Sequence, residues 1–201
     1  MNNDKLKIVI ATKNKGKVKE MVNAFANLPV ELISLGDLQR DFPDAVEDGK
    51  TFMENSLIKA SFYMKKTGLP CLADDSGLEV EALGGAPGVF SARYSGEKAT
   101  DDSNNAKMLE ELKNLGLETS AASYRCALTF VNTDGTSMQV LGSCNGEIKC
   151  KAQGNGGFGY DPYFYVGDKS MAQLSLEEKD AISHRGEALR KMAVLLEEYL
   201  R

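Results

Sequence analysis

The 201-residue chain contains a single histidine, no tryptophan and no excess of positive charge. Its 24 lysines and arginines are outnumbered by 29 aspartates and glutamates, so the formal net charge is -5 at pH 7. General nucleic-acid binders take most of their affinity from a broad basic surface, and this composition does not provide one. We therefore expect no nucleic-acid partner, and any site for an anionic ligand must be local.

Cysteine is sparse, and long apolar runs are missing. The cysteines have no two-residue spacing that would suggest a metal site: Cys71, Cys126, Cys144 and Cys150. With one histidine to join them, zinc binding is not indicated, and we expect reduced, mostly buried thiols. No run approaches the roughly 18 to 20 apolar residues of a membrane span, and no signal-peptide segment precedes Lys5 and Lys7. We expect a soluble, cytoplasmic protein without a membrane partner.

The first half of the chain alternates strand and helix patterns. No repeat, low-complexity tract or linker divides the sequence, so we expect one domain over residues 1–201. Strands are predicted at 6–11 and 30–34, with a helix from Lys17 between them and an irregular acidic segment at 36–50. Thr51 and Glu54 form a capping box for a helix that Gly68 ends. Its predicted core positions are Met53, Leu57, Ala60 and Met64.

The second half adds antiparallel structure. Short strands at 70–73 and 78–82 are expected to flank an acidic turn, and Thr100 caps a helix that stops near Gly116. Segments 122–132 and 136–150 surround an Asp-Gly pair, which predicts a hairpin. Further helices are predicted after Ser175 and over 183–200, the last with a stripe of apolar residues. The fold class predicted is α/β, a mixed twisted sheet flanked by helices, with a long antiparallel hairpin.

Two loops carry charge that suits phosphate and metal chemistry. Residues 12–17, Thr-Lys-Asn-Lys-Gly-Lys, lie where a strand passes into a helix, and helix N-termini attract phosphate. An ordinary solvated turn is the alternative there. Residues 74–77, Asp-Asp-Ser-Gly, combine two carboxylates with a hydroxyl, with Glu47 and Asp48 upstream. Such oxygen ligands suit Mg²⁺, whereas a solvated Asx-turn is the alternative. We expect one aspartate to face the pocket and the other to cap backbone N–H groups.

Two further segments could recognise a base. The run 154–162 contains four glycines, and Phe158 and Tyr160 within it could stack on a planar ring or belong to the core. Lys179, His184 and Arg185 lie close together in sequence near the last helix. A lone histidine is usually structural, but His184 and Arg185 together offer donors to keto or phosphate oxygens.

Six motifs occur in order: T-x-N-x-x-K at 12–17, E-D-G-x-T-F-x-E-N at 47–55, D-D-S-G-L-x-V with G-G-x-P-G at 74–88, S-A-R-Y-S-G at 91–96, G-x-G-G-F-G-Y-D-P at 154–162 and A-I-S-H-R-G at 181–186. Together they resemble the inosine triphosphate pyrophosphatase family, whose bacterial members are dITP/XTP pyrophosphatases. The resemblance runs from Thr12 to Arg185, and Lys13 departs from the small residue that many members have.

The resemblance implies a homodimeric, Mg²⁺-dependent enzyme that hydrolyses ITP, dITP and XTP to the monophosphate and pyrophosphate. It implies that Asp75 is the catalytic residue and a metal ligand, with Glu47 as the second ligand and Asp48 as the alternative. The substrate-binding residues it implies are Thr12, Lys13, Asn14, Lys15, Gly16, Lys17, Ser76, Phe158, Gly159, Tyr160, Asp161, Lys179, His184 and Arg185.

The residues also suggest how a purine would be selected. Hypoxanthine and xanthine present an acceptor at position six, where adenine presents a donor, so donors from His184 or Arg185 would favour the keto bases. Guanine shares the six-oxo group, and no residue accounts for its rejection. Two alternative functions remain: a pyrophosphatase for modified pyrimidine triphosphates of the septum-inhibitor type, and a nucleotide sensor without catalysis. A purely structural protein would leave the four polar loops unexplained.

Overall fold

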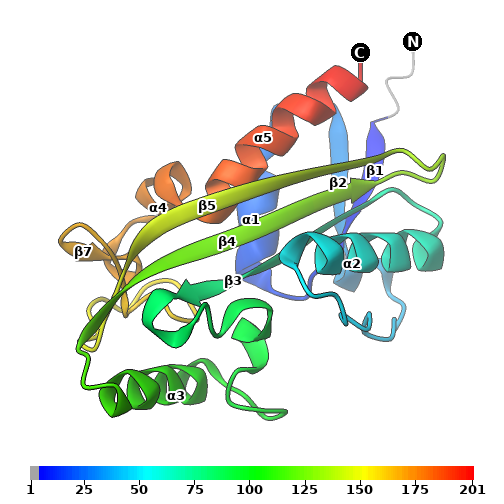
Figure 1. Cartoon of the computed structure of the whole chain (residues 1–201). Helices are drawn as coiled ribbons and strands as arrows, with labels where there is room; N and C mark the ends of the chain where they lie inside the picture. The colour runs from blue at the N-terminus through cyan, green and yellow to red at the C-terminus, as the bar shows by residue number, and fades with distance from the viewer. Residues whose placement is uncertain (1–4) are drawn as a thin grey trace. The chain divides into compact units, whose positions relative to one another are not determined.

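The computed structural model describes residues 5–201, which form two compact units interleaved in the sequence. Unit 1 takes the described residues up to Asp75, then Cys126–Gly142 and Gly186–Arg201; unit 2 takes Ser76–Arg125 and Ser143–Arg185. That residues 1–201 form a single domain stays a prediction. The chain path is drawn in Figure 1.

The elements follow the predicted alternation of strands and helices. In chain order they are β1 (Leu6–Ile10), α1 (Lys15–Ala24), β2 (Val30–Ser34), η1 (Leu35–Leu38), α2 (Phe52–Thr67), β3 (Cys71–Val80), η2 (Glu81–Leu83), η3 (Gly88–Arg93), α3 (Asp101–Asn114), β4 (Thr119–Val131), β5 (Ser137–Lys149), β6 (Phe164–Val166), β7 (Lys169–Ser170), η4 (Met171–Gln173), α4 (Leu176–Ile182) and α5 (His184–Tyr199).

The strands form one mixed sheet of order β2-β1-β3-β4-β5-β6-β7. β1 pairs parallel with β2 and with β3, whereas β6 pairs antiparallel with β5 and β7. The parallel pairs are joined through helices, as parallel strands require. The mixed α/β class and the long β4–β5 hairpin are confirmed, and the hairpin turn contains Gly135 at φ 91.

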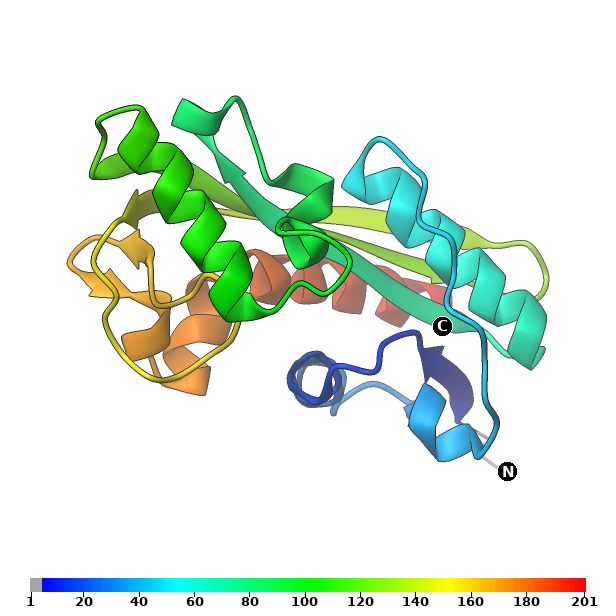
Figure 2. The same ribbon diagram turned by 90° about the horizontal axis from the view of Figure 1, so that it is seen from below.

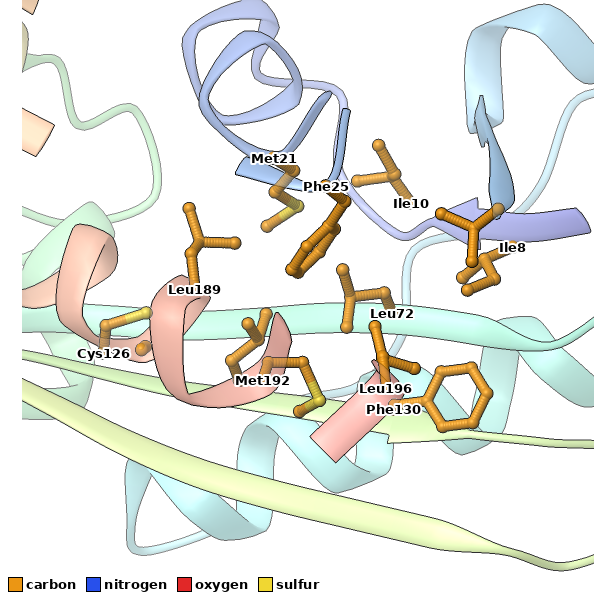
Figure 3. Close-up of a cluster of buried hydrophobic side chains, with 13 residues drawn as sticks. Ile8, Ile10, Met21, Phe25, Leu72, Cys126, Phe130, Leu189, Met192 and Leu196 are labelled. Carbon is orange, nitrogen blue, oxygen red and sulfur yellow. The ribbon is translucent and has the colours of Figure 1, made fainter. Parts of the chain in front are cut away.

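Unit 1 buries apolar side chains on both faces of its strands. Ile8 and Ile10 of β1 join one cluster, and the alternate residue Val9 joins another, because successive strand residues point to opposite faces. Figure 3 shows the first cluster, in which Met21 of α1 and the following C-cap residue Phe25 meet side chains of α5 and of the strands. The second cluster includes Ala60 and Tyr63 of α2. One face is therefore covered by α1 and α5, and the other by α2.

Unit 2 has its own core, to which α3 and the strands β3, β4, β5 and β6 contribute. Met108 and Leu112 of α3 are fully buried, and Tyr124 of β4 contacts Phe164 of β6 with ring centroids 4.5 Å apart. α3 also lies against the short helices η2 and η3 (Figure 2). The helix begins at the Thr100 capping box, as predicted, so its position along the chain is set by a local signal.

Three sequence predictions are wrong in detail. Residues 71–80 form one continuous strand, not two short strands around an acidic turn. In α2, Leu57 is 36% exposed, and the buried face instead carries the polar residues Asn55 and Ser56. In α1, Val22, which recurs at helical spacing with Val18 and Met21 and was expected to face inward, is 44% exposed. Helical spacing alone did not identify the inward face, because polar residues with buried partners occupy part of it.

Candidate functional site: two groups of polar residues

Asp74 and Asp75 are neighbours on β3 but point to opposite faces of the strand. Asp74 lies on the face that α1 covers, where its Oδ2 is 2.8 Å from Nζ of Lys17. Asp75 lies on the face that α2 covers, and the Asn55 side chain hydrogen-bonds to it. The expected split of roles between the two aspartates is therefore supported, although Asp74 pairs with a lysine where backbone capping had been expected.

Asp75 sits in an environment that disfavours its charge. Burial raises its pKa to about 6; Glu47 and Asp74 act in the same direction, while Lys59 and the Asn55 hydrogen bond oppose them. Within residues 5–201, its buried Oδ2 has no hydrogen-bond partner. A buried acceptor without a donor is costly, and such atoms occur where a metal ion, water or catalysis makes use of them.

The segment before α2 is fixed by a short series of hydrogen bonds. The N–H of Gly49 donates to Asn55 Oδ1 at 2.8 Å, and the N–H groups of Lys50 and Thr51 donate to Glu54 Oε2 at 2.6 and 3.2 Å. A Cβ on Gly49 would lie 2.6 Å from the Asn55 oxygen, so the close approach requires glycine. These contacts hold the acidic segment that carries Glu47 against α2.

Lys59 is a charged residue of this group that sequence reasoning missed. Its Nζ lies 2.9 Å from Glu47 Oε2 and donates to the Asp74 carbonyl oxygen at 3.2 Å. Burial opposes its charge, yet the surrounding carboxylates Asp74, Glu47 and Asp75 hold its pKa above the usual value. The sequence offers one indication of this role, because Lys59 follows Asn55 by four residues and therefore shares a helix face with it. Only the structure shows that this face points inward.

The Thr12–Lys17 loop differs from the expected open phosphate cradle. Asn14 caps α1, its Oδ1 accepting from the N–H groups of Gly16 and Lys17 at 2.9 and 3.2 Å. Two donors that were expected to face phosphate are thus already satisfied. Lys13 is exposed and pairs with Asp44 at 2.8 Å, and Lys15 is exposed. Phosphate contacts from this loop remain a prediction, and they rest on side chains more than on these two N–H groups.

The donor set around β3 fits a hard divalent cation. Asp75 and Glu47 supply carboxylate oxygens, and both electrostatically influence Lys59 in unit 1. No cluster of three or more histidine, cysteine, aspartate or glutamate side chains occurs among residues 5–201. Mg²⁺ is commonly held by one or two carboxylates together with substrate phosphates, so a two-carboxylate set is sufficient. Asp48 is exposed and, among residues 5–201, makes no hydrogen bond or ion pair with this group.

In unit 2, Asp161 gathers the residues of the glycine-rich loop. Its Oδ2 accepts from the Phe158 N–H at 2.9 Å and from Lys179 Nζ at 2.7 Å, and its Oδ1 accepts from the Tyr124 hydroxyl at 3.3 Å. Gly157 has φ 74, and a Cβ there would collide with the Asp161 carboxylate. Asp161 and Lys179 are both buried, so the ion pair fixes the loop from within.

Phe158 and Tyr160 have different environments in spite of their similar sequence positions. Phe158 is half-buried, with Lys179 Nζ 4.7 Å and Arg185 Cζ 5.7 Å from its ring centroid. Tyr160 is buried in the unit 2 core and donates its hydroxyl to the Ser91 carbonyl oxygen at 2.8 Å. This burial argues against base stacking by Tyr160 and leaves Phe158 as the stacking candidate.

His184 and Arg185 are both buried at the start of α5. The His184 ring stacks on Tyr124, with centroids 4.6 Å apart and planes inclined by 11°. Arg185 donates from Nη2 to the Ser76 hydroxyl at 3.1 Å. The structure therefore brings together, within unit 2, five of the residues proposed to contact substrate: Ser76, Phe158, Asp161, Lys179 and Arg185.

Tyr124 was not anticipated from the sequence, although it contacts two of the predicted site residues, Asp161 and His184. It lies inside a strand whose other residues read as ordinary core, so no local signal marked it. Burial, followed by the nearby Asp161 carboxylate, raises the pKa of its hydroxyl well above the usual value. The Tyr124 hydroxyl therefore stays protonated and acts as a neutral donor to Asp161.

Within the described part of the chain, no helix combines the length and apolar character needed to cross a membrane. The four cysteines are free, and Cys150 is the exposed one, as expected for reduced, mostly buried thiols.

Comparison with known proteins gives consistent matches. The family model described as Ham1 family matches residues 8–195. A dITP/XTP pyrophosphatase of Geobacter sulfurreducens is 51% identical over 185 residues, covering 91% of this chain and 92% of the relative. A dITP/XTP pyrophosphatase of Thermus thermophilus is 48% identical, covering 96% and 92%. The solved structure of a HAM1 protein from Coxiella burnetii superposes with a TM-score of 0.88 at 42% identity, covering 96% of this chain and 99% of the other.

Proposed function

Because the chain belongs to the Ham1 family, we propose that it is an Mg²⁺-dependent pyrophosphatase that hydrolyses dITP, ITP and XTP to the nucleoside monophosphate and pyrophosphate. The observation that carries the proposal is the near-complete match to relatives that are dITP/XTP pyrophosphatases, at up to 51% identity. The polar groups on the two units are chemically suited to that reaction. We also propose that the enzyme is a cytoplasmic homodimer, as the family resemblance implies.

Asp75 is proposed as the general base. Its Oδ2 has no hydrogen-bond partner among the described residues and can accept the proton of an attacking water. Without metal, its pKa of about 6 leaves it largely ionised at pH 7 yet more basic than an ordinary aspartate. General-base catalysis by such a group contributes about 10²- to 10⁴-fold to the rate.

Asp75 and Glu47 are the residues proposed to hold Mg²⁺. When bound, the ion would neutralise charge on the triphosphate. Lys59 keeps Glu47 in place and offsets the charge of the carboxylates around it. Lys17, paired with Asp74, and Lys15 are proposed to contact the phosphates and stabilise the departing pyrophosphate.

Recognition of the base is proposed for unit 2. Phe158 offers a ring for stacking, and His184 and Arg185 offer donors for the six-oxo group of hypoxanthine or xanthine. Adenine places an amino donor at the same position, so it would leave those donors unpaired. Sites built on such hydrogen bonds can discriminate by about 10⁴ to 10⁵.

The direct test is a substrate panel. Pyrophosphate release is measured for ITP, XTP, GTP, ATP and dUTP, with and without Mg²⁺. Rapid release from ITP and XTP that depends on Mg²⁺ is expected, and equal rates for ATP and ITP would refute the selectivity. A preference for the pyrimidine substrate would point to the alternative pyrophosphatase class, and binding without release would point to a sensor.

The metal assignment has its own matched pair of variants. Glu47→Gln removes a carboxylate that contacts Lys59, whereas Asp48→Asn removes the exposed neighbouring carboxylate. Only Glu47→Gln is expected to raise the Mg²⁺ concentration needed for half-maximal turnover, by about tenfold or more, as for loss of one ligand or its support. The opposite result would assign the ligand to Asp48.

A further inference from the structure

Both backbone polar groups of Gly159 are held by side chains of α3. The Gly159 N–H donates to Asp101 Oδ2 at 2.7 Å, and Asn105 Nδ2 donates to the Gly159 carbonyl oxygen at 2.9 Å. Asp101 and Asn105 are four residues apart, so they lie on one face of the helix. Figure 2 shows the N-terminal end of α3 beside the loop of residues 150–162. Two hydrogen bonds from α3 therefore hold the loop at the residue next to Phe158.

The same short segment is held from a second direction. The Phe158 N–H donates to Asp161 Oδ2 at 2.9 Å, and that oxygen also accepts from Lys179. Gly157 and Gly159 both have positive φ, at 74 and 63. A segment so rich in glycine has many accessible conformations when unrestrained. The contacts from α3 and from Asp161 together restrict the peptide groups on both sides of the Phe158 ring.

Packing alone does not explain the Asn105 side chain. The residue is 7% exposed, and its buried Oδ1 has no hydrogen-bond partner among residues 5–201. Burying an amide oxygen without a donor is unfavourable, and an apolar side chain of similar size would avoid that penalty. The favourable contact that distinguishes asparagine from leucine here is the hydrogen bond to Gly159.

We propose that Asp101 and Asn105 are positioning residues that hold the ring of Phe158 in place for stacking on the substrate base. The proposal rests on the proposed function and adds to it two residues outside the predicted site. Stacking on a ring that is already ordered avoids the entropy of ordering it during binding. Loss of either hydrogen bond from α3 to Gly159 should therefore weaken substrate binding and leave the hydrolytic step largely intact.

The first test compares Asp101→Ala with Asp102→Ala. Both aspartates are exposed and lie in the first turn of α3, so both variants lose the same interaction with the helix dipole. Asp102 makes no hydrogen bond or ion pair with the loop in the described part of the chain, which makes it the matched control. Asp101→Ala is expected to raise KM for ITP by about tenfold, the size expected for one charge-assisted hydrogen bond, with kcat within about twofold.

The conservative variant Asp101→Asn keeps an acceptor oxygen and should restore KM to within about threefold of the wild type. An unchanged KM in Asp101→Ala, or an equal rise in Asp102→Ala, would overturn the proposal.

Asn105→Leu separates positioning from a structural role. The variant removes a buried oxygen without a partner but also removes the donor to the Gly159 carbonyl oxygen, and because these two effects on stability oppose each other, its urea midpoint should stay close to that of the wild type. Its KM for ITP should nevertheless rise, by about tenfold. A fall in stability, with kcat lowered by the same factor as KM is raised, would mean that Asn105 only supports the fold.

A third measurement does not depend on turnover. The chain has no tryptophan, so Phe158→Trp introduces a single tryptophan at the ring position, whose emission can be excited apart from that of the tyrosines. In this background Asp101→Ala should lower the fluorescence anisotropy, and Asp102→Ala should not. Unchanged anisotropy in Asp101→Ala would show that Asp101 does not restrict the motion of the side chain at position 158, and would overturn the proposal. If the wild type released no pyrophosphate from ITP or XTP, the proposed function would fail, while the anisotropy would still decide whether α3 orders the ring position.

Discussion

Asp75 of unit 1, a half-buried carboxylate, and Asp161 of unit 2, a buried one, both belong to polar groups, but their surroundings differ. Asp161 accepts from three donors, namely the Phe158 N–H, Lys179 and Tyr124. Asp75 receives a hydrogen bond from Asn55, while its Oδ2 has no partner among residues 5–201 and its pKa is raised to about 6. A saturated carboxylate holds other groups in place, whereas an incompletely satisfied one remains available to a proton or a cation.

The lysines that accompany these two carboxylates differ in a similar way. Lys179 forms a buried pair with Asp161 and lies over the Phe158 ring, so its charge organises a surface for an aromatic ligand. Lys59 contacts Glu47 and the backbone of Asp74, and it moderates a group of carboxylates. Unit 1 thus concentrates charge that chemistry can use, and unit 2 uses charge mainly to fix side chains.

Asp75→Asn is expected to have the largest effect. The amide cannot accept a proton from water at neutral pH, so kcat should fall by roughly 10²- to 10⁴-fold while nucleotide binding is preserved. Initial rates of pyrophosphate release and equilibrium binding of ITP in the presence of a chelator measure the two quantities. Asp41→Asn, at an exposed site of unit 1, is the control. Near-normal turnover of Asp75→Asn would remove the difference between the two carboxylates.

Asp161→Asn should destabilise the protein. The change leaves the ammonium of Lys179, whose side chain is 8% exposed, without its carboxylate. Removing one partner of a buried ion pair costs about 3 to 5 kcal/mol of unfolding free energy. Urea unfolding followed by far-ultraviolet circular dichroism measures the loss. A change below about 1 kcal/mol, the range of exposed ion pairs, would show that the pair is not a structural anchor.

Asp75→Asn should have the opposite effect on stability, and the effect should depend on pH. The folded-state pKa of about 6 exceeds the ordinary aspartate value of 3.8, so the ionised carboxylate weakens the folded state. That penalty is absent below about pH 4 and fully present above about pH 6. Without metal, the variant should therefore gain roughly 1 to 3 kcal/mol over the wild type at pH 7.5 and almost nothing at pH 3.5. An equal difference at both pH values would contradict the assignment.

Lys59→Met should lower turnover moderately. The variant leaves Glu47, Asp74 and Asp75 without their shared cation, so Glu47 loses its anchor and Asp75 becomes harder to ionise. A loss of roughly tenfold in kcat at pH 7 is expected, corresponding to about 1.4 kcal/mol. Lys65→Met, at an exposed position of the same helix, controls for the loss of a helical lysine. Equal activities of the two variants would rule out a role for Lys59.

Gly49→Ala tests whether the acidic segment must lie close to α2. The added methyl would meet Asn55 Oδ1 at 2.6 Å and Glu54 Cβ at 2.8 Å, so the segment has to shift. A loss of about 1 to 3 kcal/mol in stability is expected from this overpacking, with weaker activation by Mg²⁺. Gly36→Ala, where the nearest atom lies at 3.6 Å, should change stability by less than about 0.5 kcal/mol.

Helix boundaries were the most predictable part of the fold. The capping boxes at Thr51, Thr100 and Ser175 begin helices where the sequence indicates, and Gly68 ends α2 in the left-handed conformation. These signals are local, because each involves hydrogen bonds between residues a few positions apart. The β4–β5 hairpin was equally predictable, since Asp134 and Gly135 specify the turn between two strands.

The acidic segment of β3 shows where local reasoning fails. Asp-Asp-Ser-Gly has the composition of a turn, yet residues 71–80 remain extended within the sheet, between β1 and β4. Asp74 is tolerated there because Lys17 of α1 lies against it, and Asp75 because Asn55 and Lys59 of α2 lie nearby. None of these partners is within ten residues, so no window of sequence could have placed them.

Motif and spacing were sufficient to predict the fold class, the helix limits and the residue types suited to a nucleotide, because they depend on short-range hydrogen bonds and on chemical identity. Packing decided which oxygen of Asp75 has no partner among the described residues, that Tyr160 belongs to the core while Phe158 does not, and that Lys59, Tyr124, Asp101 and Asn105 contact predicted site residues. Burial, pKa and hydrogen-bond partners arise from residues distant in sequence, and they exist only once the strands and helices have been brought together.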